Sequence, residues 1–341
     1  MVNYIYTPQS DYFKCRVPLR ETLQAFVVDG TLQQEGSTGL KKGKGGKGYE
    51  ISFGKDSPSG KILQIISIRS HNTDGTLEYG NSIFVEENSE ASLLLCSHTF
   101  TMNGFQTKEK LDINISQCGR LNLVIMQNEH DRSHHNTSIN IEIGRDAICK
   151  LHLVTLHGGK IDNKINISLN GKGGECNLHG LYLAGGNQEI SNCVNIYHNA
   201  GECKSNQLFK GILDGNAVTR FSGTIYVEKD AQKTEAYQAN NNLLSSDNAT
   251  AYTKPHLEIY ADDVKCSHGA TVGSLDEDEL FYMRSRGISL EEAKLLQQQA
   301  FANATIEDLA NPELRERLTS LIESRLRGEF SECQNCDRHC C

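Results

Sequence analysis

An internal repeat of strand-like segments constrains the fold of this chain more than any other feature. Four short segments place Asn between two β-branched residues, and they lie 26, 26 and 29 residues apart: Ile113-Asn114-Ile115, Ile139-Asn140-Ile141, Ile165-Asn166-Ile167 and Val194-Asn195-Ile196. Each unit holds two segments of alternating polarity separated by Gly/Asn turns, which is typical of β-strands. One strand pair cannot bury its apolar face, whereas stacked units can. The repeat therefore predicts a mainly β protein built as a β-solenoid.

A second series runs in phase with the first and repeats a cysteine. The segments "AICKLHL", "GECNLHGL" and "GECKSNQL" place Cys149, Cys176 and Cys203 at intervals of 27 residues. We interpret these cysteines as an inward ladder of small apolar side chains, since free Cys packs well in cores. The alternative is an interior path lined with sulfur. His152 and His179 repeat in the same way, and we interpret them as ladder residues rather than ligands.

The repeat ends near Gly273, and helical signals follow. Ser289 and Glu292 form a capping box, and Asn311 before Pro312 predicts the start of a last helix that ends at Gly328. We expect four parts: an N-terminal segment over 1–60, a β-helix core over 61–273, a helical subdomain over 274–328 and a Cys-rich tail over 329–341. The Gly/Lys-rich stretch at 39–50 is interpreted as a mobile loop, with anion binding as the alternative. The predicted inward face of the middle helix comprises Ala293, Leu296, Ala300, Phe301 and Ala304.

Composition excludes several classes of partner. The net charge is −9, so a nucleic-acid partner is not expected. The chain starts without an apolar signal region and has no run of about 18 apolar residues, which argues against a membrane partner. We therefore expect a cytoplasmic protein. Its twelve cysteines are then expected to be thiols that pack, bind metal or react.

Two groups of soft ligands are candidate sites. Cys266 and His268 are two residues apart near the end of the repeat, so on a strand they face the same way, about 6.6 Å apart. Both can bind a soft metal, but two ligands are an incomplete set that a partner or distant residues must complete. The alternative is a packed thiol beside a hydrogen-bonded imidazole. The tail offers a second candidate metal site through Cys333, Cys336, His339, Cys340 and Cys341, or it is an unanchored, oxidation-prone terminus.

A third candidate is the segment "NEHDRSHHN" at 128–136. Glu129, His130, Asp131, His134 and His135 could gather a divalent ion. The segment falls where a turn between repeat strands is expected, so we interpret it as a solvated loop.

No catalytic motif is present. The chain has no G-x-S-x-G and no H-E-x-x-H, and its carboxylates show no acid/base spacing. A polysaccharide-active β-helix enzyme would need aromatic platforms, and the absence of Trp argues against it. A stand-alone metal-binding protein that acts through its tail remains an alternative function.

The stretch that contains "YADDVKCSHGATVGSLDEDELFYMRSRGISLEEAK" resembles the SufB/SufD family of iron–sulfur cluster assembly proteins, and so does "FSGTIYVEKDAQKTEAYQANNNLL" before it. The strong resemblance covers residues 195–305, and the "KCSHG" pattern resembles the SufD branch. Members of the family carry a helical segment before the β-helix, of which this chain shows little or none. The Cys-rich tail is not part of the family pattern.

The resemblance implies a right-handed parallel β-helix with a small C-terminal α-helical subdomain. It implies a non-catalytic scaffold in a complex with a SufB-like protein and a SufC-like ATPase, which would carry any ATPase activity. In that complex His268, beside Cys266, would face a SufB cysteine where a transient, shared iron–sulfur cluster forms, and the helical subdomain would dock the ATPase. A homodimer is also possible.

Overall fold

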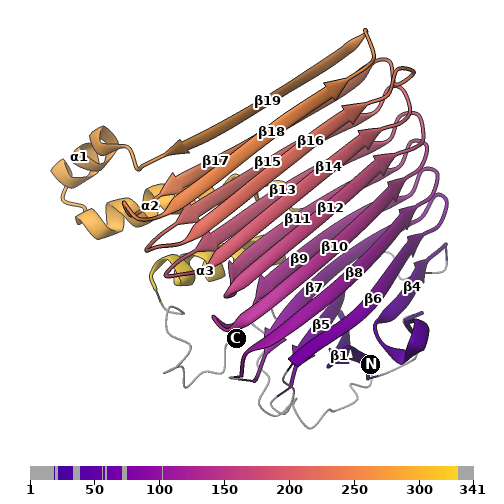
Figure 1. Cartoon of the computed structure of the whole chain (residues 1–341), viewed down its shortest axis with the longest axis horizontal. Coiled ribbons are helices and arrows are strands. Elements are labelled where there is room, and N and C mark those ends of the chain that lie inside the picture. The colour runs from indigo at the N-terminus through magenta and orange to yellow at the C-terminus, as the bar shows by residue number, and fades with distance from the viewer. Residues whose placement is uncertain are drawn as a thin grey trace.

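The chain forms a β-solenoid in which each coil gives one strand to each of two facing parallel sheets (Figure 1). The computed structural model describes residues 19, 22–33, 39–55, 57, 60–70, 75–101 and 103–328. Sheet A contains β1 (Leu23–Val28), β2 (Thr31–Leu32), β5 (Leu63–Arg69), β7 (Glu90–Thr99), β9 (Arg120–Asn128), β11 (Ile148–His157), β13 (Glu175–Ala184), β15 (Lys204–Leu213), β17 (Thr234–Leu244) and β19 (Val264–Gly273). Sheet B contains β3 (Lys41–Lys42), β4 (Tyr49–Phe53), β6 (Gly75–Val85), β8 (Phe105–Ile115), β10 (Ser133–Ile143), β12 (Lys160–Leu169), β14 (Glu189–His198), β16 (Val218–Val227) and β18 (Thr250–Ile259).

The turns that join sheet B to sheet A have a shared backbone conformation. In six successive coils one turn residue has a positive φ: Asn88, Cys118, Asp146, Gly173, Glu202 and Lys233. The turns also stack, because the amide of Cys118 donates to the carbonyl of Arg145 and that of Asp146 donates to that of Lys172. Stacked turns satisfy backbone groups outside the strands, which keeps successive coils parallel.

The strand register confirms most of the predicted repeat. Ile139 pairs with Ile165 and Ile165 with Val194, as the pattern predicts, but Ile139 pairs with Leu111 instead of Ile113. The prediction for the first unit was therefore wrong by two residues, which leaves each side chain on the same face. The asparagines of the pattern form an outer ladder, in which Asn166 donates to Asn140 and Asn195 to Asn166, each at 3.0 Å.

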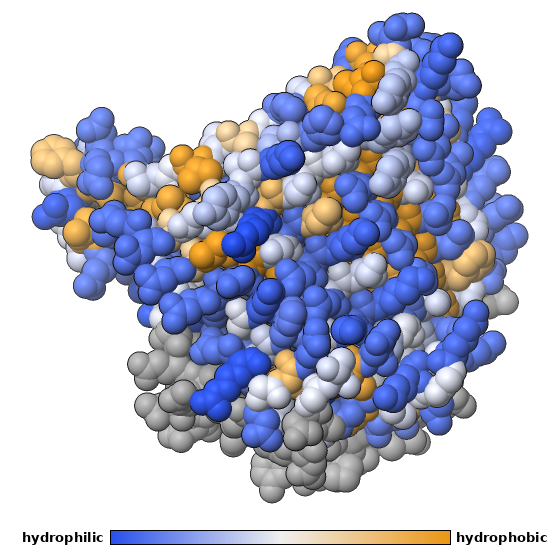
Figure 2. Space-filling view, viewed as in Figure 1, coloured by the Kyte–Doolittle hydropathy of each residue, from blue (hydrophilic) through white to orange (hydrophobic). Residues whose placement is uncertain are grey.

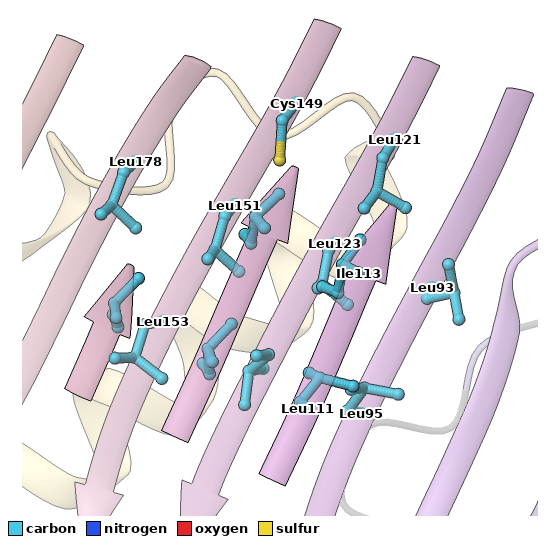
Figure 3. Close-up of a cluster of buried hydrophobic side chains, with 14 of the residues drawn as sticks. Leu93, Leu95, Leu111, Ile113, Leu121, Leu123, Cys149, Leu151, Leu153 and Leu178 are labelled. Atoms are coloured by element: carbon cyan, nitrogen blue, oxygen red, sulfur yellow. The ribbon is translucent and has the colours of Figure 1, made fainter. Parts of the chain in front are cut away.

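The space between the sheets is filled by aliphatic side chains from both of them. Figure 3 shows leucines of sheet A, such as Leu95 and Leu123, packed against Leu111 and Ile113 of sheet B. Cys149 and Cys176 are buried neighbours in register, which confirms the cysteine ladder for these two. Cys203 is buried too, but it precedes β15, and Ser205 takes the position next to Cys176.

Parallel pairing extends toward the N-terminus beyond residue 61. β1 pairs with β5 and β4 pairs with β6. The Gly/Lys-rich stretch, interpreted as a mobile loop, instead forms β3, the short 3₁₀ turn η1 (Lys44–Gly46) and the start of β4. Gly48 is required there, because a Cβ at its position would lie 1.9 Å from the carbonyl oxygen of Gly80.

Three helices follow the last strand: α2 and α3 pack on the outer face of sheet A, while α1 packs on α2 and projects beyond the strands (Figure 1). They are α1 (Glu277–Ser285), α2 (Leu290–Asn303) and α3 (Pro312–Leu326). The predicted caps are confirmed: the side chain of Ser289 accepts from the amide of Glu292, and that of Asn311 accepts from the amide of Leu314. Among the described residues no helix combines the length and the apolar character needed to cross a membrane.

The buried face of α2 differs in part from the prediction. Ala293 is buried as expected, but Leu296 is 40% exposed, while Leu295 and Ala302 are buried. Leu296 was assigned by helical spacing alone, and spacing does not indicate which of two adjacent leucines meets the sheet.

Candidate functional site

The last coil of the solenoid is open. Within the described part of the chain, β19 has only β17 as a sheet neighbour, and β18 has only β16. Both strands are mostly exposed or half-buried, in contrast to the strands before them. Hydrophobic side chains gather near the upper end of β18 and β19 in Figure 2. Ile259, the last residue of β18, is 37% exposed, and Tyr260 after it is 58% exposed. Exposed strand edges with apolar side chains favour association with another chain.

Cys266 and His268 lie on β19 and face the interior side of this open coil. Cys266 is in register with Ala236 and His268 with Gln238, and both of these β17 residues are buried inside the solenoid. Partners in a parallel sheet share a face, so both ligands line the uncovered end of the interior. The predicted pair is therefore brought together on one face, as the spacing implied.

The two side chains differ in their surroundings. Cys266 is half-buried against a small apolar cluster that includes Ile225, Ala236 and Leu257, whereas His268 is exposed. Burial raises the pKa of the Cys266 thiol above its ordinary value, although a hydrogen bond with the backbone of Ala236 opposes this. The thiolate, not the neutral thiol, is the form of cysteine that binds metal, so Cys266 and His268 by themselves are a weak metal site. A metal ion or a cationic neighbour would favour the thiolate.

A column of small side chains leads to Cys266 through the interior. Successive strands of sheet A place Cys149, Cys176, Ser205, Ala236 and Cys266 in register. Ser205 and Ala236 separate Cys176 from Cys266 in this column, so the column is not a continuous sulfur-lined path. It is a packing column with a thiol at its exposed end.

The segment at 128–136 is not a solvated loop, so that interpretation was wrong. Residues from Ser133 onward belong to β10, and Glu129, His130 and His135 are nearly fully buried. Its side chains do not converge on one ion: His135 pairs with Glu129 at 2.7 Å, Asp131 with His157 at 2.9 Å and His134 with Asp162 at 2.9 Å. Burial alternates along β10, with Ser133 buried and His134 half-buried, as in a strand and not as in a solvated loop.

A constellation that sequence reasoning missed lies elsewhere, on the outer face of sheet A. The side chains of His152, His179 and Asp308 place one ligand atom each within 4.8 Å of one another. The repeated position of the two histidines was visible in the sequence, but Asp308 lies 156 residues after His152. The candidate tail ligands Cys333, Cys336, His339, Cys340 and Cys341 lie outside the described residues.

Comparison with known proteins finds a matching family model and several similar proteins. The model of the SUF system FeS cluster assembly SufBD core domain matches residues 68–301. The iron-sulfur cluster assembly protein SufD of Escherichia coli is 34% identical over 255 residues, which cover 74% of this chain and 60% of that protein. An iron-sulfur cluster assembly SufBD family protein of Mycobacterium tuberculosis is 31% identical over 262 residues, 74% of this chain and 65% of that one. SufD of Bacillus subtilis is 33% identical over 117 residues, 34% of this chain and 27% of that one.

The fold and the family match define the class of protein: a β-solenoid that contains a SufBD core domain. The chain belongs to the SufB/SufD family, on its SufD branch. It spans about 60–65% of the length of the first two relatives described above.

Proposed function

We propose that this chain is a non-catalytic scaffold subunit that pairs with a SufB-like protein through its open coil. The observation that carries the proposal is the uncovered interior face of β18 and β19, which holds Cys266 and His268. A second solenoid end placed against these strands would extend both sheets and bury that face. Backbone pairing would supply affinity and the inner side chains specificity, as in other strand-addition interfaces.

The ligand chemistry fits a shared site. Thiolate and imidazole both bind iron, but a four-coordinate iron or cluster corner needs more ligands than this strand offers. The partner's ligands would complete the set, and the nascent cluster is the cargo of the site rather than a resident group. Approach of a partner metal or cation would also favour the thiolate of Cys266, whose pKa burial otherwise raises.

The helical segment is the proposed docking surface for a SufC-like ATPase. Four apolar side chains on α1 and α2 are exposed: Phe281 at 73%, Tyr282 at 59%, Leu290 at 40% and Leu296 at 40%. Aromatic and aliphatic side chains gathered on an exposed face are enriched at protein interfaces. ATP hydrolysis would belong to that partner, whose conformational change would shift the population of the paired ends.

The test is an anaerobic co-purification. The chain is co-expressed with a SufB-like and a SufC-like protein as wild type, as His268→Ala and as His256→Ala. His256 is a matched control, since it is an exposed histidine on β18 whose position in the strand alternation places it on the outer face. We expect all three complexes to form, and we expect only His268→Ala to lose the visible absorbance of the iron–sulfur cluster.

Two results would contradict the proposal. Equal colour in all three complexes would make His268 a structural residue. A wild-type chain that elutes as a monomer or as a homodimer, without the SufB-like protein, would remove the proposed partner.

A further inference from the structure

His152, His179 and Asp308 form a compact group where the helices meet the sheet. His152 Nε2 lies 2.8 Å and His179 Nδ1 lies 3.0 Å from the same oxygen, Asp308 Oδ1. We propose that these three atoms bind a divalent transition-metal ion that fastens the α2–α3 connection to the outer face of sheet A. This site lies on the outer face of sheet A, whereas Cys266 and His268 face the interior, and it does not depend on the proposed partners.

The two histidines are placed by the solenoid itself. They are in register on β11 and β13, and on the same face Val124 of β9 and Leu208 of β15 flank them. Their rings meet edge to face, with centroids 5.3 Å apart and planes at 89°. Rigid neighbouring strands therefore present two imidazole nitrogens side by side with little conformational freedom to lose on binding.

The carboxylate is placed by a well-packed connection. Asp308 lies between α2 and α3, and the side chains of Ile306 and Leu309 on either side of it are 1% and 7% exposed. Thr305 further fixes this turn by donating its hydroxyl to the carbonyl of Ala302 at 2.7 Å. Asp308 is thus held over the histidines by buried anchors, not by a free loop.

The donor set indicates the class of metal. Two imidazoles and one carboxylate, without sulfur, suit a borderline ion such as Zn²⁺ or Fe²⁺ rather than Mg²⁺ or Ca²⁺. A tetrahedral site with bonds of about 2.05 Å has ligand atoms about 3.3 Å apart. The two nitrogen–oxygen distances are about 0.3–0.5 Å shorter than this, and the two nitrogens lie within 4.8 Å of each other, so metal binding requires the carboxylate to withdraw and the imidazoles to adjust. The side chain of Asp308 is 37% exposed, which leaves solvent access for a water as fourth ligand.

Asp308 interacts strongly with both histidines. The pKa of Asp308 is held far below its ordinary value: burial opposes this, but hydrogen bonds and charge interactions with both histidines outweigh it. Among the described residues, this is the one group of three or more His, Cys, Asp or Glu side chains whose ligand atoms all lie within 4.8 Å of one another.

The test uses Co²⁺ as a spectroscopic probe and Zn²⁺ as a stabilising ligand on the full-length chain. The parent protein carries substitutions of the tail ligands (Cys333→Ser, Cys336→Ser, His339→Gln, Cys340→Ser and Cys341→Ser), so that the tail cannot bind the probe. We expect one Co²⁺ per chain with ligand-field absorption and without sulfur-to-cobalt charge transfer. Zn²⁺ should raise the midpoint of thermal unfolding of this parent.

Variants of the parent separate the site from other histidines. We expect His179→Gln and Asp308→Asn each to weaken Co²⁺ binding at least roughly tenfold, whereas His256→Gln leaves it unchanged. If a variant unfolds, X-ray absorption of the zinc-loaded parent identifies the ligands of the metal instead. The proposal requires imidazole scattering from two histidines. Absence of Co²⁺ binding, unchanged binding in both variants, or a sulfur-containing coordination shell would overturn the proposal.

Discussion

His135 is a buried imidazole held between two carboxylates. Its Nδ1 lies 2.7 Å from Glu129 and its Nε2 lies 3.4 Å from Glu109. Burial alone would lower the pKa of His135, but attraction to Glu129 and the interactions with Glu109 outweigh it and raise the pKa to about 10. The pKa of Glu129 is lowered in turn, because the attraction of His135 outweighs its burial. The two carboxylates therefore favour the charged form of His135 inside the solenoid.

Replacing His135 should destabilise the chain in a pH-dependent way. The raised pKa means that His135 contributes stability in full below pH of about 6.5 and loses it as pH rises toward about 10. We expect His135→Gln to lower the free energy of unfolding by about 3–5 kcal/mol at pH 6, because it leaves Glu129 buried and unpaired. The loss should be smaller at pH 9.5.

Urea denaturation followed by circular dichroism at both pH values measures this difference. His256→Gln, at an exposed ion pair with Glu258, is the control and should change stability by less than about 1 kcal/mol. A loss for His135→Gln that is equal at pH 6 and pH 9.5 would contradict the assignment of a charged imidazole.

Of the two groups of candidate ligands, only the one that depends on local spacing could be predicted from the sequence. Cys266 and His268 could be placed on one face from their spacing, because strand alternation is local. Asp308 could not be connected to His152 and His179, since their meeting depends on how the α2–α3 connection packs on sheet A. Long-range packing of this kind leaves no periodic signal in the chain.

At the scale of elements, α3 is held on the outer face of sheet A by an apolar contact and by one long-range hydrogen bond. Leu314, Leu318 and Ile322 are buried in the cluster shared with the outer face of sheet A. Arg325 Nε donates to the carbonyl of Leu156 at 2.9 Å, so the end of α3 is also tied to β11. Most of the stability of this helix should come from its packing rather than from its own propensity.

Leu318→Ala should therefore lower the free energy of unfolding by about 2–5 kcal/mol, through lost burial and the cavity left behind. Arg317→Ala on the exposed face of α3 is the matched control, and it should change stability by no more than about 0.5 kcal/mol. Denaturant unfolding of both variants measures the effect. Equal stabilities would mean that α3 does not rest on sheet A in solution.

Element boundaries and caps were more predictable than register. The caps at Ser289 and Asn311 depend on side chains within three residues, and both are confirmed. The register of Ile113 and the position of Cys203 depend on turn length, which varies from coil to coil. A shift of two residues keeps every side chain on its face, so the hydrophobic pattern could not reveal the error.

At the scale of the whole molecule, the solenoid is a stack in which each coil covers the one before it. The last described coil, β18 and β19, carries its candidate ligands on a face that no later coil covers. Such a stack requires a cap or a partner at its open end. We propose that a SufB-like solenoid end is that partner.

Hydrogen–deuterium exchange of the chain, alone and with a SufB-like protein, tests this claim most directly. Backbone amides at an open sheet edge exchange readily, and pairing with another strand protects them. We predict that binding slows exchange within 250–273, which holds β18 and β19, and leaves α1–α3 unchanged. Binding that protects the helices or the N-terminal coils, while exchange within 250–273 is unaltered, would contradict the account.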